Sequence, residues 1–141
     1  GNERQTTFSK LFAPGKDTLT VYSFMLTPGG NACPACTSLI DGLDGMAPHI
    51  QDKMNFAVFA KAPIAEFRAW GRTWGWQNVR LLSTGAATYN ADYHTETNEQ
   101  SQTPAINVFR KTDEEIFRTC GSEMFFTPSP DGMHPHHVDT I

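Results

Sequence analysis

The sequence predicts an α/β protein built in three layers, with helices covering both faces of a central mixed sheet. Strand-like runs alternate with helical patterns through the first half of the chain, which implies right-handed crossovers between parallel strands. Two further strand-like runs near the C-terminus are separated by a short polar turn, which predicts an antiparallel hairpin joined to the same sheet. A pair of cysteines, Cys33 and Cys36, lies between the first long strand and the first long helix.

The size and composition indicate one globular domain. We expect the 141 residues to form a single domain, with a loose N-terminus over 1–7 and an irregular tail over 121–141. The hydrophobic fraction of 39% suits a buried core rather than disorder. A balance of 11 basic against 15 acidic residues does not favour nucleic acid as a partner, and no apolar run is long enough to cross a membrane. The sequence opens without a secretory pattern, so we expect a cytoplasmic protein.

The first half of the chain predicts a helical turn, a central strand and a long helix. Apolar residues recur at helical spacing over 8–12, and the run 18–26 is rich in β-branched and aromatic residues typical of a strand. A helical pattern follows over 34–50, with a proline in its first turn, where the missing N–H costs nothing. We expect Pro48 to kink or end this helix near 44–47.

A second strand, helix and strand follow. The nearly continuous apolar run 55–60 is typical of a parallel strand that is buried on both faces. Pro63 then begins a helical pattern that Gly75 ends, and 76–83 predicts a third strand.

The remainder of the chain predicts a long connection and the hairpin. Polar residues dominate 84–102, and we expect at most a short helix near Tyr93 there. The runs 105–109 and 115–119 predict the two antiparallel strands.

The cysteine pair predicts thiol–disulfide chemistry. A helix N-terminus presents unpaired N–H groups and a partial positive charge, which favour a thiolate. We therefore expect Cys33 to be the exposed nucleophile with a moderately lowered pKa, and Cys36 to lie one turn further in and resolve the mixed disulfide. Between them, Pro34 and Ala35 offer no charge or side-chain hydrogen bond. A carboxylate close to the pair, such as that of Asp44, would raise the pKa.

Two motifs resemble those of the thioredoxin-like fold. One is Cys33-Pro34-Ala35-Cys36 between a strand and a helix, and the other is Thr103-Pro104 at the start of a later strand. In thioredoxin-like proteins that proline is usually cis and lies beside the cysteines. The resemblance therefore implies a substrate groove formed by Pro34, Ala35, Thr103 and Pro104, with a cis peptide bond before Pro104.

Further segments resemble a bacterial family described as uncharacterised, thioredoxin-like, predicted dithiol–disulfide oxidoreductases. The resemblance covers most of the chain and implies an enzyme that uses a redox-active disulfide, no other cofactor, and protein or small-molecule thiols and disulfides as partners. A homo-oligomer is compatible with it. The segments that carry it, besides the cysteines, are Tyr22-Ser23-Phe24-Met25, Asp41-Gly42-Leu43-Asp44-Gly45, His49, Ala62-Pro63, Gly75-Trp76 and Leu82-Ser83.

The sequence departs from thioredoxins in two places. Asn31 and Ala32 stand where thioredoxins carry a tryptophan before the first cysteine, and no helical pattern follows Thr119. One face of the sheet could therefore be covered by the tail, a partner or another copy of the chain.

A zinc site is one alternative to the redox pair. A structural zinc ion needs four ligands, and one C-x-x-C supplies two. Cys120 or the tail histidines (His134, His136 and His137) could add more, but no second C-x-x-C is present. A solvated tail is the preferred interpretation of these histidines, and no metal is expected.

Two other functions compete with the oxidoreductase. A peroxidase of the peroxiredoxin type needs a threonine or serine and a proline upstream of its cysteine, where this chain has Gly30 and Leu26. A non-catalytic interaction domain with a vestigial dithiol stays open.

Several single residues have a structural interpretation. The helical spacing of Trp70 and Trp74 predicts packing in the core. Cys120 is expected to be a small buried hydrophobe, while His49 and His94 are expected at the surface or bonded to neighbours.

Overall fold

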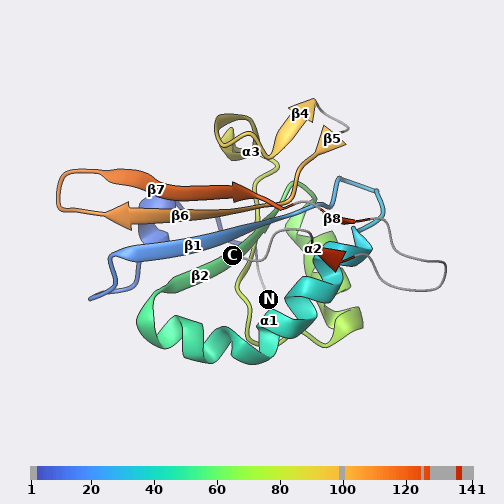
Figure 1. Ribbon diagram of the computed structural model, residues 1–141, viewed down its shortest axis with the longest axis horizontal. Helices are drawn as coiled ribbons and strands as arrows, with labels where there is room; N and C mark the ends of the chain where they lie inside the picture. Colours follow the sequence, from blue (N-terminus) through green and yellow to red (C-terminus); the bar gives the residue numbers. More distant parts are fainter. Residues whose placement is uncertain (1–2, 99–100, 125, 128–135, 138–141) are drawn as a thin grey trace.

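The protein is built on a five-stranded mixed sheet. The computed structural model describes residues 3–98, 101–124, 126–127 and 136–137 (Figure 1). The sheet has the order β3-β2-β1-β6-β7, in which β1, β2 and β3 are parallel, β6 is antiparallel to β1, and β7 is antiparallel to β6. The strands are β1 (Thr18–Phe24), β2 (Asn55–Ala60), β3 (Leu81–Ser83), β6 (Ala105–Lys111) and β7 (Ile116–Glu123). The predicted α/β class, with parallel strands and a C-terminal antiparallel hairpin, is confirmed, and the arrangement is consistent with a thioredoxin-like α/β fold.

Helices and short ladders complete the described part of the chain. The helices are η1 (Phe8–Leu11), α1 (Pro34–Lys53), α2 (Ile64–Trp74) and α3 (Tyr89–Asp92). The short strands are β4 (Glu96–Asn98), paired with β5 (Ser101–Gln102), and β8 (Phe126–Thr127), paired with β9 (His136–His137).

The central strands separate two hydrophobic cores. Successive side chains of a strand point to opposite faces, so β1 and β2 contribute to both cores. Tyr22 and Val58 belong to the core formed with α1 and α2, where Phe67 packs. Val21 and Phe59 belong to the opposite core, which η1 and α3 close with aromatic side chains. Figure 1 shows α1 and α2 on one side of the sheet and α3 on the other.

Several predicted elements have the expected bounds. β2 spans the apolar run 55–60, and all six of its residues are buried. α2 begins after Pro63 and ends at Gly75, whose φ of 76° is the left-handed conformation that glycine adopts readily. The helical turn near residue 8 is η1, and β6 and β7 form the predicted hairpin.

The first long helix is longer than predicted. α1 continues through Pro48 to Lys53, although a proline inside a helix removes one backbone hydrogen bond. Pro48 lies on the exposed side of the helix, while Ala47 and Ile50 pack in the core on either side of it. Tertiary packing of these two side chains outweighs the local cost of the proline.

The third strand is shorter than predicted because a side chain from α1 holds the segment before it. The Asp44 carboxylate accepts backbone N–H hydrogen bonds from Gln77, Asn78 and Val79 at 2.8–3.2 Å. These N–H groups are therefore engaged away from the sheet, and β3 begins only at Leu81.

The polar connection 84–102 contains more structure than predicted. α3 lies slightly before the expected position near Tyr93, and the β4–β5 ladder was not predicted. The connection is tied to the sheet by Lys61, which forms an ion pair of 2.6 Å with Glu96.

Two predictions about buried residues were wrong. Cys120 is exposed on β7, which is an edge strand of the sheet. Trp74 is 45% exposed instead of packed in the core, whereas Trp70 is partly buried and packs against the core as predicted. His49 and His94 lie at the surface as expected.

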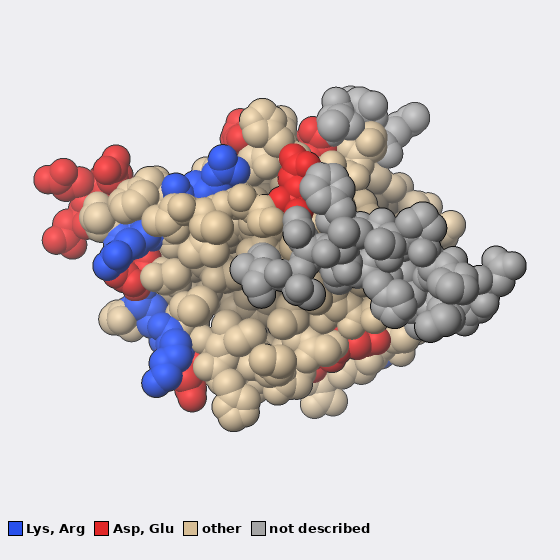
Figure 2. Space-filling model, viewed as in Figure 1, with Lys and Arg blue, Asp and Glu red and all other residues tan. Residues whose placement is uncertain are grey.

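The surface carries mixed charges at the tip of the hairpin. Figure 2 shows one face, on which basic side chains stand next to acidic ones at the end of the sheet that carries the β6–β7 turn. Among the described residues, no helix is long and apolar enough to cross a membrane.

Candidate functional site

Cys33 caps the N-terminus of α1, as the strand-to-helix pattern predicts. The backbone N–H of Cys33 donates to the carbonyl of Met25 just beyond β1, at 3.1 Å. Pro34 then occupies the first position of the helix, where its fixed φ suits helical geometry. The carbonyl of Cys33 accepts hydrogen bonds from both the backbone N–H (3.0 Å) and the hydroxyl (2.9 Å) of Thr37. The backbone on both sides of the sulfur is therefore fixed.

The two cysteines have different environments. Cys33 is partly exposed, whereas Cys36 is fully buried at 0% exposure, and neither forms a disulfide. The Cys33 sulfur accepts a hydrogen bond of 3.3 Å from the backbone N–H of Cys36. The Cys33 thiol is therefore accessible from solvent, whereas the Cys36 thiol is not.

The environment of Cys33 favours its thiolate. A hydrogen bond from the Cys36 side chain has the largest effect; partial burial opposes it, and the backbone N–H groups of Cys36 and Ala35 support it. Together they lower the pKa of Cys33 from 9.0 to about 6. The lowered pKa of Cys33 is as predicted, but the prediction that the helix N-terminus is its main cause is wrong, because the side chain of Cys36 has the larger effect.

The environment of Cys36 favours its neutral thiol. Burial raises the pKa of Cys36 far above its ordinary value, and the interaction with Cys33 raises it further. The hydroxyl of Tyr22 and the backbone of Met25 act in the opposite direction. Cys36 therefore stays protonated while Cys33 is free to attack.

A polar recess opens beside the Cys33 sulfur. It has a volume of about 310 Å³, and Cys33 is one of the residues that line it. Its lining residues come from the loop after β1 and from β5, and they are Met25, Thr27, Asn31, Cys33, Ser101 and Gln102.

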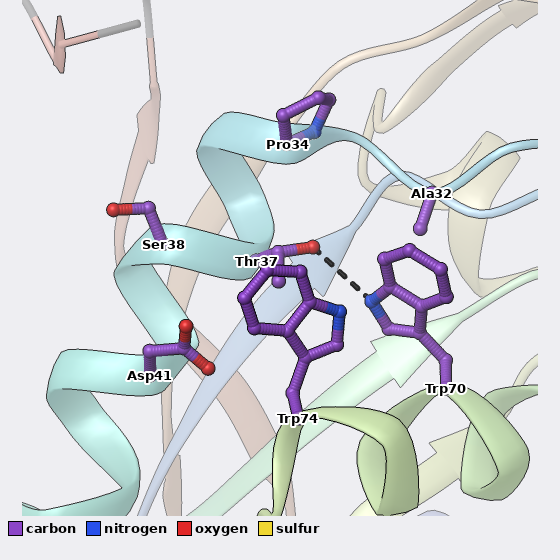
Figure 3. Close-up of a pocket in the computed structure, with 7 residues that line it drawn as sticks. All are labelled: Ala32, Pro34, Thr37, Ser38, Asp41, Trp70 and Trp74. Carbon is purple, nitrogen blue, oxygen red and sulfur yellow. Dashed lines mark hydrogen bonds between the residues drawn. The ribbon is translucent and has the colours of Figure 1, made fainter. Parts of the chain in front are cut away.

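An apolar pocket lies between the first turns of α1 and the tryptophans of α2. It has a volume of about 140 Å³, and Figure 3 shows the two indoles of α2 facing the first turns of α1 across it. The Trp70 indole N–H donates to the hydroxyl of Thr37 at 3.1 Å, and Trp74 lies at the open edge. The remaining lining residues are Ala32, Pro34, Ser38 and Asp41.

The residues predicted to form a substrate groove have different surroundings. Pro34 lines the apolar pocket, but Ala35 is 3% exposed and contributes to the core instead. Thr103 and Pro104 line neither cavity; Ser101 and Gln102 of β5 stand beside Cys33 in their place. The polar β4–β5 ladder had no hydrophobic periodicity by which the sequence could reveal it.

The predicted cis peptide bond before Pro104 is wrong. The Thr103–Pro104 bond is trans, as are the other peptide bonds of the described residues. The trans form is favoured by about 0.5–1 kcal/mol for a bond before proline. It is compatible here with hydrogen bonds from the Thr103 N–H to the Thr95 carbonyl and from the Met124 N–H to the Pro104 carbonyl.

Asp44 does not act on Cys33. Its carboxylate is occupied by the backbone of the 77–79 loop and is absent from the groups that shift the pKa of Cys33. Burial opposes ionisation of Asp44, but the N–H groups that it accepts hold its pKa below the ordinary value of 3.8.

The described residues do not form a metal site. No group of three or more histidine, cysteine, aspartate or glutamate residues is close enough to hold an ion in the part of the chain that the structure describes. Cys120 is on β7, opposite Val108 and away from the cysteine motif. His134 and the side chains of His136 and His137 lie outside the described residues.

Comparison with known proteins gives a family but no function. Residues 1–132 match the family described as "Bacterial protein of unknown function (DUF899)". No curated protein and no solved structure matches the sequence. Because the match spans nearly the whole chain, the protein belongs to this bacterial family of unknown function.

Proposed function

We propose that the protein is a thiol–disulfide oxidoreductase of the thioredoxin-like superfamily that exchanges a Cys33–Cys36 disulfide with protein or small-molecule thiols. The observation that carries the proposal is the asymmetry of the pair. Cys33 is partly exposed, caps a helix and has a pKa of about 6, while Cys36 is buried next to it. A low-pKa, accessible thiolate with a second thiol one turn away is the arrangement that reversible disulfide exchange requires.

The reaction in the reducing direction has two steps. The Cys33 thiolate attacks one sulfur of a substrate disulfide, forms a mixed disulfide and releases the first substrate thiolate. Cys36 then loses its proton to solvent and attacks the Cys33 sulfur, which forms the Cys33–Cys36 disulfide and releases the second substrate thiolate. Two electrons pass from the cysteine pair to the substrate, and no bound cofactor is required.

The two cavities support a polypeptide substrate. Cys33 lines the polar recess, and the apolar pocket beside Pro34 offers the indoles of Trp70 and Trp74 to a neighbouring side chain. The proposal includes a cytoplasmic location, where a reducing environment keeps an exposed thiol such as Cys120 free.

An insulin-reduction assay tests the proposal. The wild-type protein and Cys33→Ser are compared in a Cys120→Ser background, which removes the exposed third thiol. Catalysis by the pair predicts turnover that Cys33→Ser abolishes, while Cys36→Ser accumulates a mixed disulfide with the substrate. Insulin reduction at the uncatalysed rate with the wild-type pair would refute the oxidoreductase activity and leave the non-catalytic interaction domain as the better hypothesis.

A further inference from the structure

The hydroxyl of Tyr22 lies in the core and forms no well-aligned hydrogen bond with any described residue. Tyr22 lies on β1, the central strand, at 0% exposure. Its hydroxyl oxygen is one of three side-chain polar atoms of the described residues that are buried with no partner, the others being in Ser23 and Gln102. A buried hydroxyl normally finds a partner because desolvation without one is unfavourable. Its position therefore calls for an explanation beyond packing.

The group beside that hydroxyl is the thiol of Cys36. Tyr22 and Cys36 belong to the same core, and each shifts the pKa of the other. Among the described residues, the titratable groups that act on Cys36 are Cys33 and Tyr22, and the backbone of Met25 also faces it. No carboxylate or imidazole of the described residues is among the groups that act on this sulfur.

We propose that Tyr22 is a catalytic residue, whose hydroxyl donates a hydrogen bond to the Cys36 thiolate as this sulfur attacks the mixed disulfide. The inference rests on the proposed oxidoreductase function and assigns a group to its second step. In that step the Cys36 proton goes to water, the Cys36 sulfur bonds to the Cys33 sulfur, and the substrate thiolate leaves with the electron pair of the broken bond. Among the described residues, no group other than Cys36 is a hydrogen-bond partner of this hydroxyl, so it is free to turn to the sulfur when the negative charge develops.

Tyr22 acts as a donor and not as a base. Burial raises the pKa of Tyr22 well above its ordinary value of 10.0, and the neighbouring Cys36 raises it further. The hydroxyl therefore keeps its proton throughout the reaction and stabilises the thiolate without accepting the proton from it.

A single-turnover reaction separates the two steps. In the Cys120→Ser background, reduced protein is mixed with an excess of dithiobis(nitrobenzoate), which releases one coloured thiolate when Cys33 attacks and a second when Cys36 resolves the mixed disulfide. The rate of the first release depends on reagent concentration, while that of the second does not. Tyr22→Phe is expected to leave the first rate unchanged and slow the second about tenfold to a hundredfold, the range for loss of a hydrogen bond to a charged group.

Tyr89→Phe is the matched control. Tyr89 is a buried tyrosine in the opposite core, and its hydroxyl accepts a hydrogen bond of 3.2 Å from the Asn107 side chain. Its loss is expected to leave both rates unchanged. The pH midpoint of the second release is a further readout. This midpoint reports the titration of Cys36, because Cys33 is blocked in the mixed disulfide and Tyr22 stays protonated. The midpoint should rise in Tyr22→Phe and stay unchanged in Tyr89→Phe.

The outcomes distinguish this inference from the proposed function. A wild-type protein that releases only one thiolate per cysteine pair would overturn the oxidoreductase. Two releases with an unchanged second rate in Tyr22→Phe, or equal slowing in Tyr89→Phe, would overturn the role of Tyr22 alone. If Tyr22→Phe does not fold, fluorotyrosine at position 22 keeps the ring and makes the hydroxyl a stronger donor; a second release no faster than in the wild type would then refute the inference.

Discussion

The Trp70 indole N–H donates to the hydroxyl of Thr37 at 3.1 Å, and this hydroxyl donates to the carbonyl of Cys33 at 2.9 Å. The contact joins α2 to the first turn of α1. It fixes the residue that carries the reactive sulfur from a helix that is distant in sequence.

Loss of the Thr37 hydroxyl is expected to destabilise the protein. Thr37 is 2% exposed, so Thr37→Val leaves the Trp70 N–H without its acceptor and removes one donor to the Cys33 carbonyl. We expect the free energy of unfolding to fall by about 1–3 kcal/mol. Denaturant titration measures the change. Thr73→Val is the control, because the Thr73 hydroxyl makes a similar bond to the Ala69 carbonyl at an exposed position. Equal losses in both variants would contradict the prediction.

The reactivity of Cys33 is expected to follow a pKa of about 6. In the Cys120→Ser background, the rate of alkylation by iodoacetamide should rise with pH and reach half its maximum near that value. Cys36→Ala should move the midpoint upward, toward 9.0, because the side chain of Cys36 is the largest cause of the shift. A midpoint that does not change in Cys36→Ala would show that the helix terminus alone stabilises the thiolate.

The same shift predicts how stability of the reduced protein depends on pH. Between pH 6 and 9.0 the unfolded chain holds the Cys33 proton and the folded chain does not, so the free energy of unfolding rises with pH over this range. The contribution is fully present above the unfolded pKa and is lost as the pH falls through the folded pKa. Urea titrations of reduced wild-type protein and Cys33→Ala across this pH range measure the contribution. If the free energies of unfolding of the two proteins changed in parallel with pH, the linkage would be disproved.

Asp44→Asn is expected to loosen the loop before β3. The variant weakens three hydrogen bonds from backbone N–H groups to a carboxylate, so we expect a loss of about 1–2 kcal/mol after solvent screening at this partly exposed site. The lowered pKa of Asp44 gives stability that is present at neutral pH and is lost as the pH falls below 3.8. Thermal unfolding at neutral and acid pH measures both effects. Asp52→Asn, on an exposed position of the same helix, should change little at either pH.

Trp74→Ala is expected to weaken the binding of polypeptide substrates but not of small disulfides. The exposed indole forms the open wall of the apolar pocket beside Pro34. We expect the KM for insulin reduction to rise about fivefold or more, with little change in the rate toward hydroxyethyl disulfide, which is too small to reach from the sulfur into the pocket. Phe117→Ala removes an exposed aromatic side chain of β7 and serves as the control. Similar losses for both substrates would show that Trp74 acts through the fold.

The elements that were predicted correctly are those with local signals. Five apolar residues in succession after Asn55 identified β2, and Pro63 and Gly75 marked the limits of α2. The cysteine motif was likewise placed at a helix N-terminus from the strand before it and the proline after it.

The features that were missed depend on distant contacts. The length of α1 depends on core packing beyond Pro48, and the start of β3 depends on a carboxylate more than thirty residues away in the sequence. Helical spacing groups Trp70 with Trp74 on one side of α2 but does not show how far that side extends beyond the sheet. The alternation of side chains along β1 puts Tyr22 and Phe24 on one face, yet only the folded chain brings the hydroxyl of Tyr22 to Cys36.

The burial of Cys36 couples the redox state of the pair to folding through a thermodynamic cycle. The free energy by which the fold favours the reduced pair must equal the stability that the protein gives up on oxidation. Because the fold stabilises the Cys33 thiolate, it favours the reduced form of the pair. The midpoint potential should therefore be more positive than the value of about −270 mV typical of thioredoxin. The difference between the free energies of unfolding of the oxidised and reduced protein would measure the same quantity without any substrate.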